Sequence, residues 1–179
     1  MDLIKTFPNA RVSWSINTLD EEFRNEMDRG VSIERWLAAM KRFYDAEIQT
    51  TCFISPLFPG ITDVKAIIEQ AKKQCNLVWL ENLNLRGDYR VRILEWIHEH
   101  HPELDGLYHE IYSKGSREYW TTLDQEMREY TKAEGMPYLR DDDQHRAAFG
   151  EPHVVVNYFY HEEVKKSAKK EKEEVNHGA

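Results

Sequence analysis

Cysteine is scarce in this sequence. Among its 179 residues only Cys52 and Cys75 are cysteines, and they stand twenty-three positions apart. Two cysteines exclude a small secreted fold held by several disulfides. They also exclude a zinc or iron–sulfur site built from three or four neighbouring thiolates. Both lie in apolar runs, so we expect them to be buried as small hydrophobic residues.

Long apolar runs and basic segments are also missing. No run is long enough for a transmembrane helix, and residues 1–8 lack the basic segment followed by apolar residues that a secretory signal requires. We therefore expect a cytoplasmic protein without a membrane partner. The 24 Lys and Arg residues are outnumbered by 32 Asp and Glu residues, giving a net charge of −8. Such an acidic chain is not typical of a protein that binds nucleic acid on its own.

Familiar catalytic and metal-binding motifs are absent from the sequence. It contains no nucleophile elbow, no glycine-rich phosphate-binding loop and no dinucleotide-binding fingerprint. The histidine-rich segment 97–102 does not fit the zinc-protease motif, because Pro102 stands four residues after His98, where a second histidine is required. We interpret this segment as the solvated end of a helix and expect no metal site.

What the sequence does contain is a set of strand patterns. Residues 11–18 alternate in polarity, with Val12, Trp14 and Ile16 on one face and small polar residues on the other. A second segment is rich in β-branched residues, and a third is a short apolar run. Strands are predicted at residues 11–18, 48–55 and 76–81.

Helix patterns separate these strands. Helices are expected to begin after Leu19, at the N-cap Ser32 and at the N-cap Thr62. Because strands and helices alternate, the strands should be parallel and joined by right-handed crossovers. With 41% hydrophobic residues the chain can bury a core, so the sequence predicts an α/β fold.

The C-terminal portion is predicted to be mainly helical. Helical patterns extend from residue 88 to about residue 134, and residues 138–152 are polar and irregular. Residues 154–160 have the composition of a late strand. After this point lysines and glutamates alternate with few apolar residues, which predicts a frayed helix or disorder. We therefore expect one domain over residues 1–162 and a charged tail over residues 163–179.

Polar side chains gather where the three predicted strands end. The segments 15–18, 55–60 and 81–86 carry hydroxyls, amides, one carboxylate and one guanidinium. Sites in parallel sheets form at the carboxyl ends of the strands, so we expect a shared pocket for a hydrogen-bonding small molecule. The alternative is that these residues serve only to form turns.

The same three segments resemble a known family. Residues 12–18, 53–63 and 78–87 resemble the fourth, fifth and sixth strand regions of a radical S-adenosylmethionine (SAM) barrel. The most specific parts are the Pro-Gly-x-Thr-Asp sequence at 59–63 and the Glu-Asn-Leu-Asn sequence at 81–84. Within the family, the chain most resembles the spore photoproduct lyase-like, or DNA repair photolyase-like, branch, which includes radical SAM proteins encoded as mobile pairs. The resemblance covers roughly the predicted domain and implies a partial, half TIM-type barrel with parallel strands and a helical C-terminal portion.

The resemblance implies roles for nine residues. Polar residues of the first strand would face the barrel lumen and contact the SAM ribose or carboxylate: Ser13, Ser15 and Asn17. Residues at the end of the second strand would lie near the adenine: Ile54, Ser55 and Pro56. Residues at the end of the third strand would line the adenine-side rim or the substrate pocket: Glu81, Asn82 and Leu83. No catalytic residue is identified.

The sequence departs from the family at its cofactor. The family's Cys-x3-Cys-x2-Cys loop, which holds a [4Fe–4S] cluster, is absent, as is its glycine-rich second-strand motif. We expect this chain to bind no cluster, to bind SAM only weakly and to be inactive alone. It would be either the C-terminal portion of a radical SAM enzyme that needs a missing N-terminal half, or a non-catalytic, self-associating interaction protein. Nucleic acid as a substrate follows only from family analogy.

The first predicted strand has an exposed edge. In the family the preceding strand belongs to the missing half, so the backbone groups of residues 12–16 lack a partner unless the late strand at 154–160 pairs with them. Neither charge nor proline within residues 12–16 blunts this edge. We therefore expect a homodimer or higher oligomer that covers it.

Overall fold

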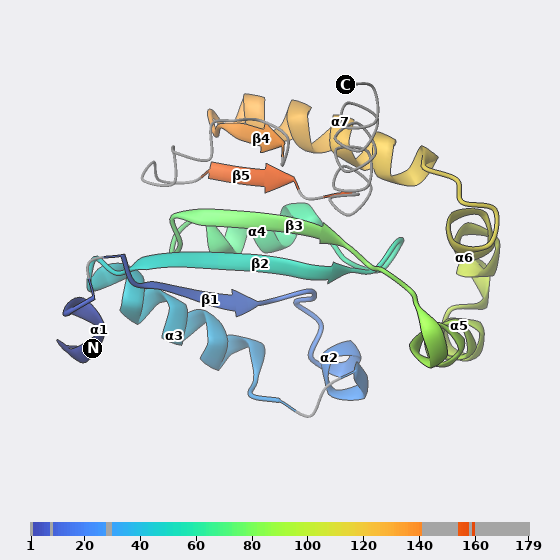
Figure 1. Ribbon diagram of the computed structural model, residues 1–179, viewed down its shortest axis with the longest axis horizontal. Helices are drawn as coiled ribbons and strands as arrows, with labels where there is room; N and C mark the ends of the chain where they lie inside the picture. The colour runs from blue at the N-terminus through green and yellow to red at the C-terminus, as the bar shows by residue number, and fades with distance from the viewer. Residues whose placement is uncertain (1, 8, 28–29, 141–153, 158, 160–179) are drawn as a thin grey trace, which may run out of the picture.

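The chain forms a five-stranded sheet with helices around it, as Figure 1 shows. The computed structural model describes residues 2–7, 9–27, 30–140, 154–157 and 159. The strands are β1 (Arg11–Ser15), β2 (Gln49–Leu57), β3 (Leu77–Asn82), β4 (Tyr138–Arg140) and β5 (Val154–Asn157). The helices are α1 (Asp2–Lys5), α2 (Glu21–Met27), α3 (Ile33–Asp45), α4 (Val64–Ala71), α5 (Gly87–His100), α6 (Asp105–Tyr112) and α7 (Glu118–Ala133), with a short 3-10 helix at Pro102–Leu104. None of the described helices is long and apolar enough to cross a membrane.

All described strand pairs are parallel, and the strand order is β1-β2-β3-β5-β4. The first three strands follow chain order, joined by α2 and α3 and then by α4, as the alternating sequence patterns predict. The predicted α/β class with parallel strands is confirmed. An open parallel sheet of this kind is what part of a TIM-type barrel contains.

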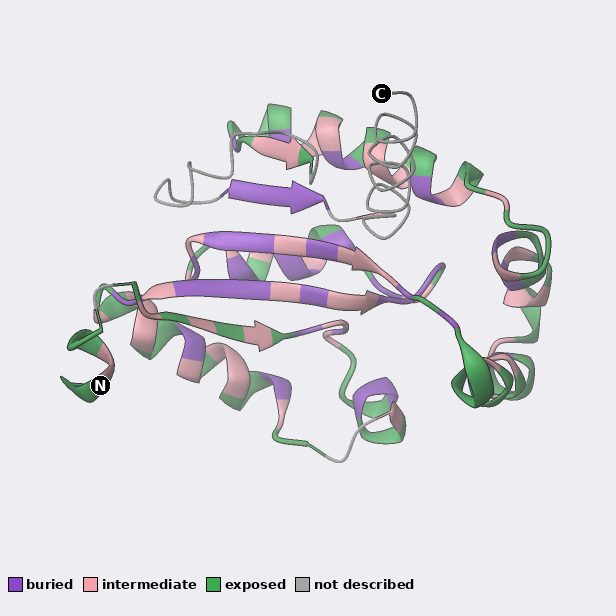
Figure 2. Cartoon of the chain, in the orientation of Figure 1, coloured by how far each residue is buried: buried purple, intermediate pink, exposed green. Residues whose placement is uncertain are grey.

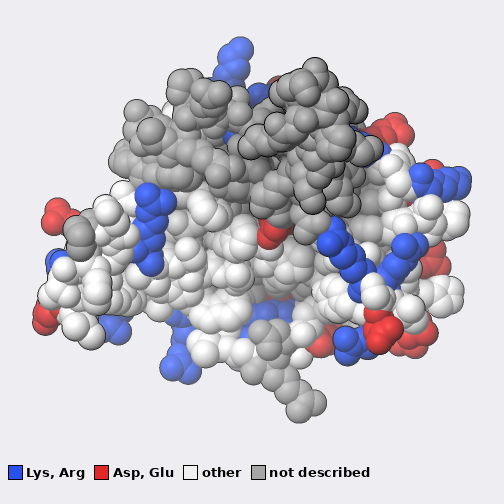
Figure 3. All heavy atoms as spheres, viewed as in Figure 1, with Lys and Arg blue, Asp and Glu red and all other residues white. Residues whose placement is uncertain are grey.

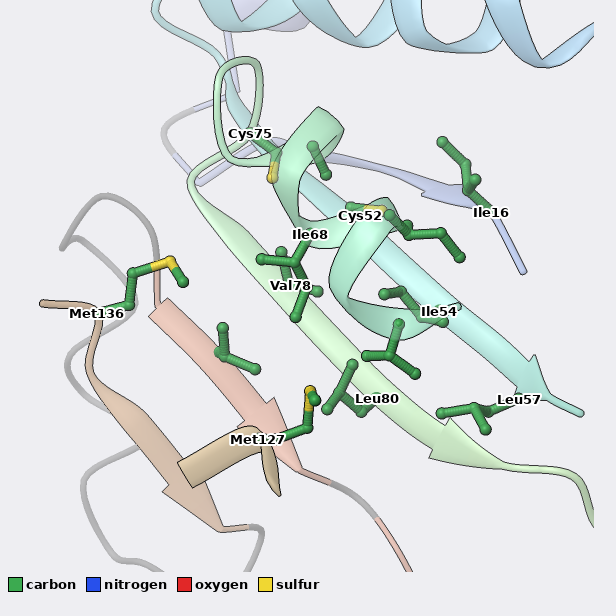
Figure 4. Packing of buried hydrophobic residues seen from close by; sticks show 14 of the residues in the cluster. Ile16, Cys52, Ile54, Leu57, Ile68, Cys75, Val78, Leu80, Met127 and Met136 are labelled. Carbon is green, nitrogen blue, oxygen red and sulfur yellow. The ribbon is translucent and has the colours of Figure 1, made fainter. Parts of the chain in front are cut away.

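One face of the sheet carries the main hydrophobic core. Side chains alternate between the two faces of a strand, so Cys52, Ile54, Val78 and Leu80 point the same way and are all buried. They pack against α3, α4 and α7, whose apolar stripes complete the cluster. Figure 4 shows Ile68 of α4 among these strand residues. Each fully buried aliphatic side chain here contributes about 1.5–3 kcal/mol to folding.

A second hydrophobic cluster lies at the carboxyl end of the sheet. It joins Phe23 of α2, Phe58 and Leu83 after the strand ends, and Ile97 of α5. The rings of Phe23 and Phe58 meet edge to face with centroids 5.2 Å apart. This cluster fixes α2 and α5 beside the strand ends.

The strands β1 and β5 differ most in burial, as Figure 2 shows. No residue of β1 is buried, whereas all four residues of β5 are. Among the described residues, β1 pairs only with β2. One edge of β1 is therefore left without a strand partner in the described part of the chain.

The late strand does not pair with β1, so that possible arrangement is wrong. β5 pairs with β3, and β4 pairs with the outer side of β5. A hydrogen-bond network explains this position, because Asp124 of α7 accepts hydrogen bonds from Tyr138 of β4 (2.7 Å) and Asn157 of β5 (2.6 Å). The strand β4 itself falls within residues 138–152, which were predicted to be irregular.

Two local predictions are also corrected. Asp63, not Thr62, caps α4: its carboxylate accepts a hydrogen bond from the backbone N–H of Ala66 at 3.0 Å. The Thr62 hydroxyl instead donates to the backbone oxygen of Asn17 and accepts from the N–H of Phe58. The strand predicted to end at residue 55 continues through Pro56, because Leu57 pairs with Asn82 after a register shift. The predicted tail at 163–179 lies outside the described residues.

Candidate functional site

The carboxyl ends of β1 and β2 open into a cavity of about 390 Å³. This is the edge of a parallel sheet at which binding sites form. Strand ends and the loops after them supply Ser15, Asn17, Ser55, Pro56 and Phe58. Helices supply Arg24, Met27, Trp36, Tyr89 and Ile93.

Five of the nine residues singled out from the sequence meet at this place. Ser15, Asn17, Ser55 and Pro56 line the cavity directly. Glu81 joins them through a hydrogen bond of 2.7 Å that the Ser55 hydroxyl donates to its carboxylate. A ligand in the cavity would therefore meet the hydroxyl and amide groups at the ends of β1 and β2. The carboxylate of Glu81, on β3, is hydrogen-bonded to the Ser55 hydroxyl.

The other four residues do not line the cavity. Ser13 is exposed on β1, two residues before Ser15 on the same face. Ile54 is fully buried and points to the helix-covered face, away from the side chains of Ser15 and Ser55. Leu83 is buried in the second hydrophobic cluster, and Asn82 is half-buried at the end of β3. Their proposed contacts with SAM remain predictions.

Arg24 is a cavity residue that sequence reasoning missed. Its side chain is only 7% exposed, and its Nε donates to the Glu21 carboxylate at 2.8 Å. Its Nη2 donates to the side-chain oxygen of Asn25 at 2.6 Å. Its Nη1 is buried and has no hydrogen-bond partner among the described residues. Arg24 and Met27 lie three positions apart on one face of α2, but this spacing alone does not indicate which surface that face meets.

Glu21 shares the charge of Arg24 and fixes the start of the next helix. The hydrogen bond from Arg24 lowers the pKa of the Glu21 carboxyl below its ordinary value. The other carboxylate oxygen accepts a hydrogen bond of 2.7 Å from the backbone N–H of Ile33, the first residue of α3. The guanidinium is thereby held in place between α2 and α3.

Aromatic residues supply the apolar part of the cavity. Trp36, Phe58 and Tyr89 line it together with the aliphatic side chain of Ile93. Burial raises the pKa of the Tyr89 hydroxyl, so this group is a neutral donor at neutral pH. Flat apolar walls beside a few hydrogen-bonding groups are the usual composition of a small-molecule site.

The cysteines do not form a cluster-binding site. Cys52 and Cys75 are both buried, as the sequence predicts, and both carry free thiols. Burial raises the pKa of each thiol, that of Cys75 to about 12. A [4Fe–4S] cluster needs thiolates, and two cysteines cannot supply the three that the family motif provides. Within the described residues, no group of three or more histidine, cysteine, aspartate or glutamate side chains could hold a metal ion.

Two comparisons with known proteins found a match to part of this chain. Residues 1–71 match the model of the radical SAM superfamily, and this segment holds β1, β2 and α4. The chain is also 30% identical over 104 residues to "Uncharacterized protein MJ0683" of Methanocaldococcus jannaschii. That match covers 58% of this chain and 39% of the relative, so the chain spans well under two thirds of the relative's length. No solved structure matches the chain significantly.

Proposed function

We propose that this chain is the SAM-binding portion of a radical SAM enzyme and that the cavity at its strand ends receives the adenosyl part of SAM. One observation carries the proposal: a cavity at the carboxyl ends of two parallel strands, within the segment that matches the radical SAM superfamily. SAM supplies the radical chemistry of such enzymes once a reduced cluster acts on it. This chain's residues do not fit the cluster, so another polypeptide segment would have to hold it.

The cavity residues can bind and orient an adenosine. The Asn17 amide and the Ser15 hydroxyl can hydrogen-bond to the two ribose hydroxyls. Ser55 keeps its proton directed at Glu81, which leaves its oxygen lone pairs as acceptors toward the cavity. Trp36, which is only partly buried, offers a ring face or edge to the adenine. Affinity for SAM is expected to be weak, because the methionine part loses its contacts with the cluster.

The assignment to one branch of the radical SAM family rests on two sequence motifs. The Pro-Gly-x-Thr-Asp and Glu-Asn-Leu-Asn segments support the DNA repair photolyase-like, spore photoproduct lyase-like branch. A nucleic-acid substrate remains an analogy with that branch. Among the described residues on the face in Figure 3, acidic and basic side chains are interspersed at both sides and along the lower edge. Because the chain carries a net charge of −8, nucleic acid would need further basic surface from the segment that completes the enzyme.

A second function is favoured by the edge of β1. Among the described residues this strand has a partner on one side only. An unpaired strand edge can bind a strand of another chain. The chain would then be a self-associating interaction protein, and the cavity would have no ligand.

Calorimetric titration with S-adenosylhomocysteine distinguishes the two functions. We expect binding in the micromolar to millimolar range, and roughly tenfold weaker binding by the Asn17→Ala variant, because one or two hydrogen bonds are lost. Asn9→Ala is the matched control, since Asn9 lines a separate cavity at the amino end of the sheet. Absence of any heat of binding, or equal loss in both variants, would contradict the SAM-binding function.

A further inference from the structure

The side chain of Thr62 joins the end of β1 to the end of β2. Its hydroxyl donates a hydrogen bond of 2.9 Å to the backbone oxygen of Asn17 and accepts one of 3.0 Å from the backbone N–H of Phe58. Asn17 lies two residues after β1, and Phe58 directly follows β2. Both line the cavity. The hydroxyl of Thr62 therefore connects two walls of the cavity.

This link is buried. Thr62 is 8% exposed and Phe58 is 1% exposed. Buried polar groups are almost always hydrogen-bonded, and a buried donor without a partner destabilises the folded state. Loss of the Thr62 hydroxyl would take the acceptor from the Phe58 N–H and a donor from the Asn17 oxygen. The substitution would thus act on both strand ends at once.

The turn that carries Thr62 is held in place by other bonds. The backbone N–H of Thr62 donates to the Phe58 oxygen at 3.0 Å, and the N–H of Gly60 donates to the Tyr119 hydroxyl of α7 at 3.1 Å. These bonds fix the turn relative to β2 and α7 without the Thr62 hydroxyl. What the hydroxyl adds is the connection to Asn17, which stands 45 positions earlier in the chain.

We propose that Thr62 is a positioning residue, which holds Asn17 at the place where its amide reaches a ligand. This inference rests on the proposed function, in which Asn17 binds the ribose of SAM. Thr62 acts through Asn17, because fixing the backbone oxygen of a residue also limits where its side chain can lie. Supporting contacts of this kind determine how precisely a binding group is held.

The first measurement is the affinity for S-adenosylhomocysteine, determined by calorimetry. Thr62→Val keeps the shape but removes the hydroxyl, and we expect roughly tenfold weaker binding. Thr62→Ser keeps the hydroxyl and should bind within about twofold of wild type. Thr62→Ala also lacks the hydroxyl and takes up less room, so it replaces Thr62→Val if that variant does not fold.

A double variant separates positioning from a general loss of structure. If Thr62 acts through Asn17, adding Thr62→Val to Asn17→Ala should not weaken binding further. Independent effects would instead multiply.

Thr50→Val is the matched control. Thr50 is also fully buried, and its hydroxyl donates to the backbone oxygen of Gln74 at 3.4 Å and to the side-chain oxygen of Asn76 at 3.3 Å. These bonds lie at the amino end of β2, at the opposite edge of the sheet from the cavity. Thermal unfolding should show that both valine variants lose stability, whereas the affinity of Thr50→Val should stay within about twofold of wild type.

The second measurement needs no ligand. In Thr62→Val the backbone amide of Phe58 should exchange its hydrogen at least about tenfold faster, and the side-chain NMR signals of Asn17 should shift. Thr62→Ser and Thr50→Val should resemble wild type in both respects. If wild type binds no S-adenosylhomocysteine but these changes occur, the proposed function fails and the positioning of Asn17 by Thr62 stands.

Three results would overturn the inference. One is that Phe58 exchange and the Asn17 signals are unchanged in Thr62→Val. Another is that wild type binds S-adenosylhomocysteine and the losses from Thr62→Val and Asn17→Ala multiply in the double variant. The third is that Thr50→Val loses as much affinity as Thr62→Val, since lower stability alone would then explain the effect.

Discussion

Arg24 and Asp124 are both largely buried charged side chains, but their hydrogen bonding differs in completeness. Arg24 keeps one donor without a partner among the described residues, at the edge of a cavity. Asp124 accepts from Tyr138, Asn157, Arg140 at 2.7 Å and Arg128 at 3.2 Å. A buried polar network in which every group has a hydrogen-bond partner helps to specify one structure. We therefore assign Asp124 a role in stability, and Arg24 is one of the residues that line the candidate cavity.

Asp124→Asn should destabilise the fold by about 2 kcal/mol at pH 7, because it removes a charged acceptor from four donors. Burial by itself raises the pKa of Asp124, but the hydrogen bonds from Tyr138, Arg140 and Asn157 outweigh it and lower the pKa. A carboxyl whose folded-state pKa is lowered stabilises the fold above about pH 4, and this contribution is lost as the pH falls further. The difference between wild type and variant should therefore shrink from pH 7 to pH 3, as urea unfolding would measure.

The matched control for this prediction is Asp45→Asn. Asp45 pairs with Lys41 at 2.8 Å on the exposed surface of α3, where ion pairs contribute little. We expect a change within about 0.5 kcal/mol at either pH. If both substitutions changed the free energy of unfolding equally, the prediction that the Asp124 network stabilises the fold would be contradicted.

Sequence reasoning found the polar residues of the cavity but not its charged one. Ser15, Asn17 and Ser55 could be predicted because the end of a strand in a parallel sheet marks the usual place for a site. Arg24 could not, because periodicity shows which helix positions share a face and not which surface that face meets. The same limit explains Ile54, whose neighbour in sequence lies in the cavity while its own side chain points to the other face.

At the scale of elements, β1, β2, β3 and the late strand β5 could be predicted from local patterns, whereas β4 and the place of β5 in the sheet could not. β1, β2 and β3 have clear alternation or apolar runs of strand length. β4 has three residues in a polar stretch, and it forms because Tyr138 and Arg140 bond to Asp124 fourteen and sixteen positions earlier on α7. The order β3-β5-β4 depends on this tertiary contact, so no local pattern could give it.

The turn after β2 packs closely against the 3-10 helix at Pro102–Leu104 and the start of α6, and this contact can be tested. Gly60 has a φ of +76°, and a Cβ there would lie 2.9 Å from a methyl carbon of Leu104. Gly60→Ala should therefore lower the free energy of unfolding by at least about 1 kcal/mol. Gly106→Ala is the control, since Gly106 lies in α6 with open space around it and the substitution should stabilise by up to about 1 kcal/mol. Denaturant unfolding that gives the same sign for both would contradict this description of the turn.

At the scale of the whole molecule, we propose that the edge of β1 without a strand partner among the described residues mediates self-association. The backbone N–H of Ile16 donates to Phe53 of β2, so alternate residues such as Ser13 point their N–H groups away from β2. We expect self-association through this edge at micromolar concentration, seen by light scattering as a mass above 21.3 kDa.

Ser13→Pro should shift the chain toward the monomer without breaking the β1–β2 pairing, because it removes only an outward-facing donor. Circular dichroism and thermal unfolding would show that the variant is folded. A wild-type chain that stays monomeric, or a Ser13→Pro variant that associates as strongly as wild type, would contradict the role of this edge.

A crystal structure of the chain with S-adenosylhomocysteine tests the SAM-binding function most directly. If the cavity binds SAM, electron density for the adenosine will lie between the ends of β1 and β2. The ribose hydroxyls should then be within hydrogen-bond distance of Asn17 or Ser15. The adenine should contact Trp36. An empty cavity at saturating ligand, or density for the adenosine elsewhere on the molecule, would contradict the SAM-binding function.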